Sequence, residues 1–145
     1  MVTIIDATGC VLGRMCTRVA KRLLQGETVH VVNAEKALVS GTTKSSIKER
    51  YSFKYHVGTY RKGPFMSRMP HQIVKRTVRG MIPYQTPTGR EALKRLKAHI
   101  GVPAELKGQE TIQIEGAKRE PSGTTMTVGE ISEFLGVQTN VPEGA

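Results

Sequence analysis

The sequence predicts a single α/β domain with a basic helical extension, and three observations favour this fold class. The chain has 145 residues, of which 38% are hydrophobic, which suffices for one core and one domain over residues 1–145. A strand, a helix and a second strand follow one another near the N-terminus, which is typical of a βαβ unit with parallel strands. Lys and Arg number 22 against 12 Asp and Glu, for a net charge of +10. The apolar content excludes a disordered tail, and no apolar run reaches the ~18 residues of a membrane span.

The βαβ unit occupies the first 32 residues. Val2–Asp6 is β-branched and short, as expected for a buried strand. Thr28–Val32 is almost continuously apolar and predicts a second strand, and Ala37–Ser40 predicts a third, shorter one. Between the first two strands an amphipathic helix is expected, ended by Gly26. Its apolar stripe consists of Leu12, Met15, Cys16, Val19, Ala20 and Leu23.

The middle of the chain predicts three helices and one loop. A polar helix is expected from Thr43 to about Lys54, and the Gly- and Pro-containing residues 57–69 predict an exposed loop. Pro70 suits the first turn of a helix, and apolar residues from there to residue 82 occupy one half of the helical wheel. A further helix is expected over about Arg90–Ile100.

The C-terminal part predicts one strand and one helix. Thr111–Glu115 alternates between polar and apolar residues, which favours an edge strand. Thr127 and Glu130 have the spacing of a capping box, so a final helix is expected to begin there. The residues after Gly136 are expected to form no regular element.

The positive charge is concentrated in residues 44–99, called the basic segment below. This segment contains fourteen Lys and Arg against two Glu, whereas residues 100–145 contain three Lys and Arg against seven Glu. Solvated helix faces usually interleave Glu with Lys, and unpaired like charges repel. A localised excess of this kind favours a polyanionic partner.

Phosphate groups of folded RNA are the polyanion that the pattern fits best. A membrane surface is less suited because the helices lack a Trp- or Phe-rich face, and a DNA-binding regulator is less suited because no helix-turn-helix pair is present. The aromatic side chains of Tyr60 and Phe65 could stack on bases or pack on helices. The predicted RNA-binding residues are Arg61, Lys62, Arg68, Lys75, Arg76, Arg79, Arg90, Lys94, Arg95 and Lys97.

The residues make no positive case for catalysis. Asp6 ends the first strand, where α/β enzymes can place a catalytic acid, but a turn or capping role explains it better. The Gly9–Arg14 turn has two glycines and lacks the Lys-Ser/Thr of a phosphate loop. The alternative to RNA binding is nevertheless a small nucleotide-binding α/β module that uses the Asp6–Arg14 turn.

Metal and cofactor binding are not expected either. Five residues separate Cys10 from Cys16, which does not match zinc-ligand spacing, and the four His residues fall on separate elements. Residues 1–6 contain no signal-peptide pattern, so we expect a cytoplasmic protein with both cysteines as thiols.

Three ordered blocks resemble the ribosomal protein L13 (uL13) family. They are Ile5–Arg14; Val31–Glu35 with Ser40-Gly41; and Arg76–Pro83 followed by Gly89–Lys97. The resemblance covers roughly residues 3–103 and is closer to the archaeal and eukaryotic branch, as Arg68–His71 indicates.

The resemblance implies a three-layer α/β/α fold around a four-stranded, mainly parallel sheet, in which Thr111–Glu115 could itself be parallel. It also implies a structural role in the large ribosomal subunit, in early subunit assembly and hence in translation. The implied partners are 23S-type rRNA and neighbouring subunit proteins, with no small-molecule substrate and no membrane. Arg76–Pro83 and Gly89–Lys97 are the blocks that it implies face the rRNA.

Overall fold

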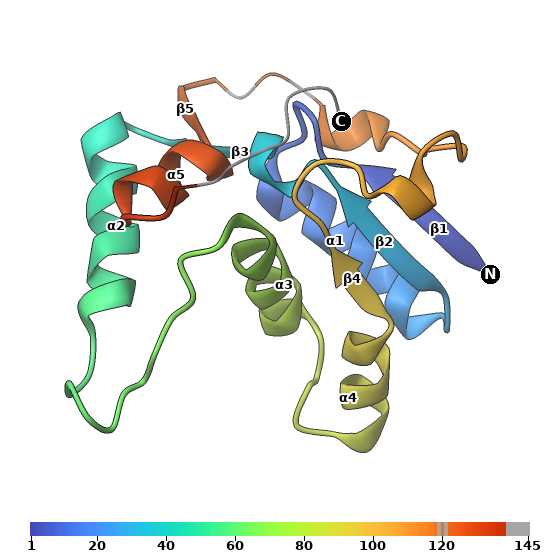
Figure 1. The fold of residues 1–145 in the computed structure, drawn as a ribbon, viewed down its shortest axis with the longest axis horizontal. Helices are drawn as coiled ribbons and strands as arrows, with labels where there is room; N and C mark the ends of the chain where they lie inside the picture. The colour runs from blue at the N-terminus through green and yellow to red at the C-terminus, as the bar shows by residue number, and fades with distance from the viewer. Residues whose placement is uncertain (119, 121, 139–145) are drawn as a thin grey trace.

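The computed structural model describes residues 1–118, 120 and 122–138, and it has a mixed α/β fold (Figure 1). Most of the tail after Gly136, for which no regular element was expected, lies outside the described residues. Three short 3-10 helices, η1, η2 and η3, cover Ala34–Lys36, Ala104–Leu106 and Glu115–Ala117. The strands are β1 (Val2–Asp6), β2 (Thr28–Val32), β3 (Leu38–Gly41), β4 (Leu96–Ala98) and β5 (Thr124–Thr127), and the helices are α1 (Leu12–Leu24), α2 (Lys44–His56), α3 (Pro70–Met81), α4 (Pro87–Lys94) and α5 (Val128–Phe134).

The predicted βαβ unit is confirmed. Strands β1 and β2 pair in parallel, with Val2 opposite Thr28 and Asp6 opposite Val32. The six residues of the predicted apolar stripe are the buried residues of α1. Gly26 follows the helix with φ of +96°, a conformation that glycine adopts without strain.

The predicted helix over Arg90–Ile100 is wrong in its second half. Helix α4 ends at Lys94, and Leu96–Ala98 forms β4, which pairs in parallel with β2 through Leu96 opposite Val29. The apolar spacing of this stretch fits a helix, but burial of Leu96 and three ladder positions on β2 favour a strand. The sheet order is therefore β1-β2-β4 (Figure 1).

The resemblance implies four strands in the main sheet, whereas the structure has three strands and one additional bridge. Thr111–Glu115 is not a strand, but Ile112 forms an isolated parallel bridge to Ile5 on the free edge of β1. Its amide donates to Ile4 at 2.8 Å, and its carbonyl accepts from Asp6 at 3.2 Å. The bridge between Ile112 and Ile5 is parallel, and Ile112 is the one residue at the position that a fourth strand would occupy.

The two faces of the sheet are covered unequally. Ile5, Val29 and Val31 belong to the main core together with residues of α1 and α3. On the other face, Ile4 and Val32 pack against Leu106 and Val102 in a small second cluster. The implied third layer thus consists of η2 and its flanking chain rather than of a long helix.

The predicted third strand exists but belongs to a separate sheet. Strand β3 pairs antiparallel with β5, from Leu38 opposite Thr127 to Gly41 opposite Thr124. Strand β5 was not predicted from the sequence. The predicted capping box is present: Glu130 N donates to Thr127 Oγ1 and Thr127 N donates to Glu130 Oε2, both at 3.1 Å.

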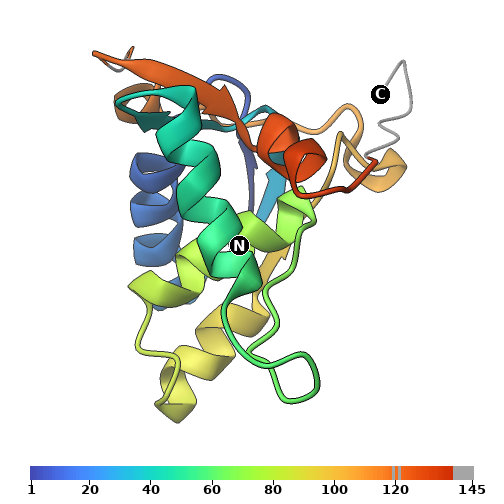
Figure 2. The same ribbon diagram turned by 90° about the vertical axis from the view of Figure 1, so that its left-hand side faces the viewer.

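Helix α2 stands beside the small sheet and α5, and it leads into the loop that precedes α3 (Figure 2). Ile47 and Tyr51 are its only buried residues in the described part of the chain, which agrees with the polar helix predicted from Thr43 to about Lys54. Residues 57–69 contain no helix or strand, as expected for a loop. This arrangement leaves the loop and α4 projecting from the same side of the core, with α3 between them (Figures 1 and 2).

Candidate nucleic-acid interface

Helix α3 turns its cations away from the core because its apolar residues are buried on the other side. Ile73, Val74 and Val78 are buried against the core. The opposite side carries three cations, Lys75, Arg76 and Arg79, called the α3 cations below. They line a shallow recess of ≈ 210 Å³ together with Ser67, Gln72 and Leu93.

Two of the α3 cations are oriented by neutral partners. Arg76 donates to the carbonyl oxygen of Phe65 at 3.5 Å, and the Arg79 guanidinium lies 4.2 Å from the ring centre of Tyr84. The hydrogen bond from Arg79 holds the pKa of the Tyr84 phenol below its usual value. These contacts restrict the side chains without neutralising their charge, so both remain able to bind an anion.

A tight turn connects α3 to α4 and fixes the second row of cations. Thr86 caps α4 by accepting a hydrogen bond from Gly89 N at 3.2 Å. Gly89 packs so closely on the turn that a Cβ there would lie 1.9 Å from the carbonyl oxygen of Pro83. Arg90 and Lys94 are exposed on α4, and Lys97 is exposed on β4.

Arg95 serves the fold instead of the exposed surface. Its Nη2 donates to the carbonyl oxygen of Leu23 at 2.9 Å, near the C-terminal end of α1. Its Nε atom is buried. A cation at this end of α1 complements the helix dipole and adds a second donor to the Leu23 carbonyl, which also accepts from Gly26 N at 3.1 Å.

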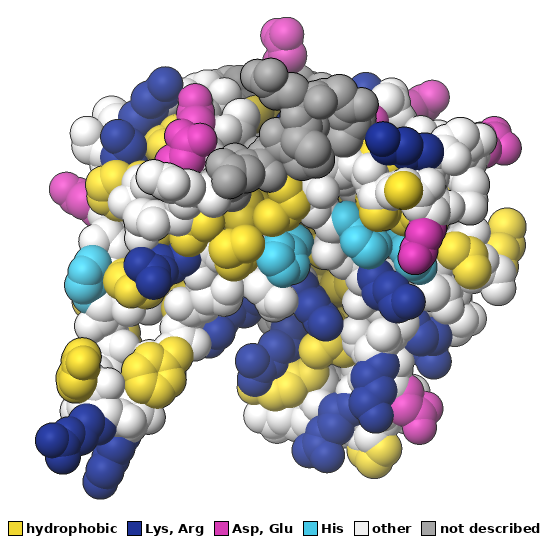
Figure 3. Space-filling model, in the orientation of Figure 1, with side chains coloured by type: hydrophobic (Ala, Val, Ile, Leu, Met, Phe, Trp, Pro, Cys, Tyr) yellow, Lys and Arg dark blue, Asp and Glu magenta, His cyan; other side chains and the backbone are white. Residues whose placement is uncertain are grey.

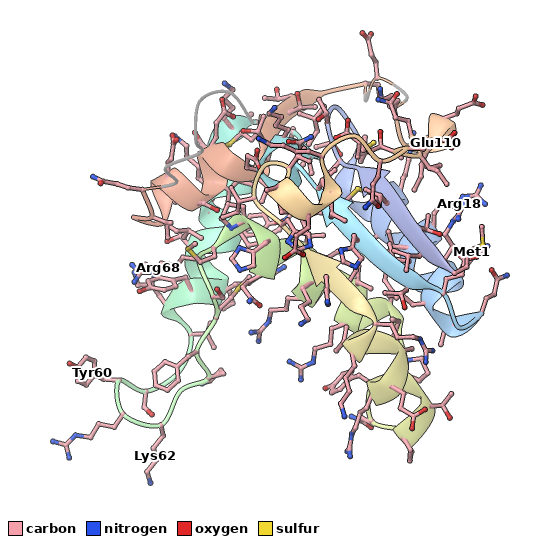
Figure 4. The ribbon with its side chains drawn as sticks, turned by 45° about the vertical axis from the view of Figure 1, so that its right-hand side comes forward. Met1, Arg18, Tyr60, Lys62, Arg68 and Glu110 are labelled. Atoms are coloured by element: carbon pink, nitrogen blue, oxygen red, sulfur yellow. The ribbon has the colours of Figure 1, made fainter. Side chains whose placement is uncertain are left out.

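The cations of the loop lie at its tip and at its base. Arg61 and Lys62 lie at the tip, where Thr59 and Gly63 exchange backbone hydrogen bonds and Tyr60 is 96% exposed. Arg68 lies at the base, 5.0 Å above the ring of Tyr55, and donates to Leu135 O at 3.3 Å. Figure 4 shows Tyr60 and Lys62 at the outer end and Arg68 beside α2. Arg68 therefore connects the loop to the end of α5, and it also adds positive charge to the surface.

No carboxylate of the described residues neutralises this surface. The one ion pair among them joins Arg22 to Glu27 at 3.2 Å, outside the basic segment. In Figure 3 the dark blue side chains gather on the lower half, over the loop tip and α3–α4, and the surface is hollowed between these two projections. Most acidic side chains in that view lie on the upper half. The basic segment is thus one cationic face with two projecting parts.

A second basic area, not singled out from the sequence, lies on the outer side of α1. Arg14, Arg18 and Lys21 line a recess against Ile114 and Gly116. Their period of three to four residues on one helix face was the available signal, but the docking of residues 114–117 against α1 is a tertiary feature.

The Asp6–Arg14 turn is built around its own hydrogen bonds. Asp6 Oδ1 accepts from Thr8 N at 3.0 Å, from Thr8 Oγ1 at 2.7 Å and from Asn33 Nδ2 at 3.0 Å. Partial burial raises the pKa of Asp6, but the hydrogen bonds from Asn33 and Thr8 outweigh it and hold the value low. The carboxylate is thus a turn residue, as predicted, and it is already engaged by the chain itself.

Two histidines that the sequence analysis placed apart are in fact neighbours. His30 Nδ1 and His99 Nε2 lie 3.3 Å apart, with stacked rings, because β2 and β4 are adjacent strands. Burial, and then the other cations nearby, lowers the pKa of both rings. Within residues 1–118, 120 and 122–138 no group of three or more His, Cys, Asp or Glu could hold a metal ion.

Both cysteines are buried thiols. Burial raises the pKa of Cys16 to about 12, so this sulfur is neither a nucleophile nor a ready metal ligand. No helix in the described part of the chain has both the length and the apolar character to cross a membrane.

Comparison with known proteins identifies close relatives over almost the whole chain. The profile of the family described as ribosomal protein L13 matches residues 1–105. The protein named large ribosomal subunit protein uL13 from Archaeoglobus fulgidus is 48% identical over 137 residues, covering 92% of this chain and 87% of the relative. The proteins of the same name from Methanococcoides burtonii and Sulfolobus acidocaldarius are 43% and 45% identical and cover 92% and 93% of this chain, and 97% and 93% of their own lengths.

Proposed function

Because the chain belongs to the ribosomal protein L13 family, we propose that it binds 23S-type rRNA through its basic segment and thereby supports assembly of the large ribosomal subunit. The relatives are named as proteins of the large subunit, and the family is not enzymatic. Its place is accordingly the large subunit of the cytoplasmic ribosome, where its partners are rRNA and adjacent subunit proteins.

One observation carries the RNA-binding proposal. The fourteen cations of residues 44–99 have no carboxylate partner among the described residues, and five of them are held on the helices α3 and α4. Unpaired cations repel each other and cost stability, a cost that bound phosphates remove. Counterions released from the RNA add a favourable, salt-dependent term to binding.

The ten predicted RNA-binding residues divide into two groups. Arg68 and Arg95 have strong contacts within the chain, so in this proposal they position the surface. The remaining eight contact phosphates and sugars directly: Arg61, Lys62, Lys75, Arg76, Arg79, Arg90, Lys94 and Lys97. Recognition by such contacts depends mostly on the shape of folded RNA, because A-form helices hide their base edges in a deep, narrow major groove.

The proposal is tested with the triple variant Lys75→Gln, Arg76→Gln, Arg79→Gln. We expect weaker binding to a 23S-type rRNA transcript from Archaeoglobus fulgidus, and a slope of log affinity against log salt that is smaller by about 2–3, since each phosphate contact contributes about 0.7–0.9. Filter binding across a salt series measures both quantities.

A matched control replaces three exposed lysines outside the basic segment, Lys36, Lys107 and Lys118, by Gln. It removes the same charge and should change the slope much less. Equal slopes for the native chain and the α3 triple variant would contradict the proposal.

The assembly role is tested in cells of an archaeon that carries this family member. Depletion of the protein should lead to incomplete large-subunit particles in a sucrose gradient, and the native chain should restore complete subunits. The α3 triple variant should restore them poorly. Full restoration by this variant would show that assembly does not depend on the α3 cations.

A further inference from the structure

A groove between α2, the loop and α3 adjoins the interface described so far and shares Arg76 with it. Its volume is ≈ 490 Å³, within the range of about 300–1,000 Å³ found for small-ligand sites. Helix α2 contributes Phe53 and Val57, the loop contributes Pro64 and Met66, and α3 contributes the floor through Ile73. More of its exposed lining is apolar than polar.

The groove is open to solvent although its lining is apolar. Phe53 is 73% exposed and Val57 is also exposed, which is unfavourable for large apolar side chains without a partner. Gly80 keeps one end of the groove open, because a Cβ at this position would have no heavy atom within 4 Å. Chain packing within the described residues therefore leaves the groove unfilled.

The charges around the groove indicate what fills it. Lys54 and Arg76 line it, and no Asp or Glu does. The groove also lies within the basic segment, since all its lining residues fall between Tyr51 and Gly80. The partner must therefore present a flat apolar group next to negative charge.

We infer that this groove receives an unstacked nucleobase of folded rRNA, with Phe53 as the stacking surface and with Lys54 and Arg76 on the adjacent phosphates. The inference rests on the proposed function and specifies one site within it. Proteins recognise single-stranded bases in this way, by stacking on aromatic rings and pairing cations with the backbone. An apolar protein segment would fill the same space but would leave both cations without an anion.

Substitution of Gly80 tests the groove directly. Gly80→Leu places a side chain in the open space, and α3 tolerates it because φ at this position is ordinary and leucine favours helices. Gly13→Leu is the matched control, since Gly13 is also a helical glycine with open space, but it lies on α1 away from the groove. The probe is the Archaeoglobus fulgidus 23S-type rRNA transcript.

We expect Gly80→Leu to weaken binding by about fivefold to 150-fold, the loss seen when one stacked base is removed. Gly13→Leu should bind as the native chain does. Ultraviolet irradiation of the native complex should produce a nucleotide adduct on the tryptic peptide Tyr51–Lys54, which mass spectrometry locates. The adduct should be absent with Gly80→Leu.

Phe53→Ala provides a second variant whose folding is not in question, because the ring is mostly exposed. It should lose both affinity and the adduct, and Phe53→Tyr should retain both. Circular dichroism melts check that all variants are folded.

The outcomes separate this inference from the proposed function. If the native chain does not bind the transcript, the proposed function fails. If it binds but Gly80→Leu and Phe53→Ala bind equally well, the inference is overturned while the proposed function stands. Unchanged RNA binding together with loss of a neighbouring protein from reconstituted subunits would also overturn it, because the groove would then be a protein site.

Discussion

Residues of one type have different roles on this surface, according to the atoms that they contact. Arg90 extends from α4 into solvent, whereas Arg95, just after the end of α4, donates to the Leu23 carbonyl and is partly buried. A charged donor to a main-chain carbonyl is worth more than a neutral one, and the buried aliphatic stem adds packing. Counting basic residues therefore overestimates the number that are free to bind RNA.

Arg95→Ala should destabilise the protein by about 1–3 kcal/mol, because it removes a charged hydrogen bond and leaves the Leu23 carbonyl without this partner. Urea unfolding followed by circular dichroism measures the change. Arg90→Ala is the matched control and should stay within about 0.5 kcal/mol of the native chain. Equal stability of the two variants would show that the Arg95 contact contributes nothing to the fold.

The histidine pair should make stability depend on pH. Burial lowers the pKa of His30 and His99, with Lys97 opposing and Glu105 favouring protonation. Histidines in the unfolded chain have a pKa of about 6.5. As pH falls below that value, the unfolded chain therefore binds more protons than the folded chain, and the free energy of unfolding decreases.

We expect the thermal midpoint to fall between pH 7 and pH 5, and to fall less in His99→Gln. The comparison variant is His56→Gln, whose ring is exposed on α2 and does not belong to the pair. A pH profile that is the same in native protein and His99→Gln would refute this assignment.

At the scale of elements, the relation between α3 and α4 depends on one close backbone approach. The turn from Ile82 to Thr86 folds back on α4, and Gly89 is the point of contact. Both rows of cations are positioned by this contact, since one row lies on each helix. The interface geometry is therefore sensitive to a residue that carries no charge.

Gly89→Ala should destabilise the protein by about 2–4 kcal/mol, because the added Cβ would lie 1.9 Å from the Pro83 carbonyl oxygen and the turn must move. Gly80→Ala is the contrasting control: its Cβ meets open space, so the gain in helix propensity should leave stability equal or higher by up to about 1 kcal/mol. Chemical denaturation of both variants measures the difference. A native-like Gly89→Ala would mean that the turn does not depend on this contact.

At the scale of the whole molecule, cations occupy two projecting parts of the surface, the loop tip and α3–α4. The hollow in Figure 3 separates these two parts. An RNA that spans both would receive two independent sets of phosphate contacts. Contributions from separated sites usually add, within about 0.5 kcal/mol.

The double variants Arg61→Gln with Lys62→Gln, and Arg90→Gln with Lys94→Gln, test this arrangement. Each should weaken rRNA binding, and their losses of binding free energy should sum in the quadruple variant. Filter binding at one fixed salt concentration measures all four proteins. If the quadruple variant loses no more than either double variant, the RNA does not contact both projections.

The sequence by itself determined the features whose signals are local. The stripe of α1, the start of α3 at Pro70 and the capping box of Thr127 and Glu130 were predicted correctly, because each depends on residues within one or two helical turns. The concentration of charge in residues 44–99 and the membership of the family were also present in the sequence.

Only the tertiary structure decided which distant segments meet. The apolar spacing around Leu96 fits a helix and a strand alike, and pairing with β2 selected the strand. The same pairing brought His99 to His30, and packing on α1 gave Arg95 a carbonyl partner. Strand pairing, the role of an individual cation and the groove beside Phe53 all depend on contacts between residues far apart in the chain, and local periodicity carries no information about those contacts.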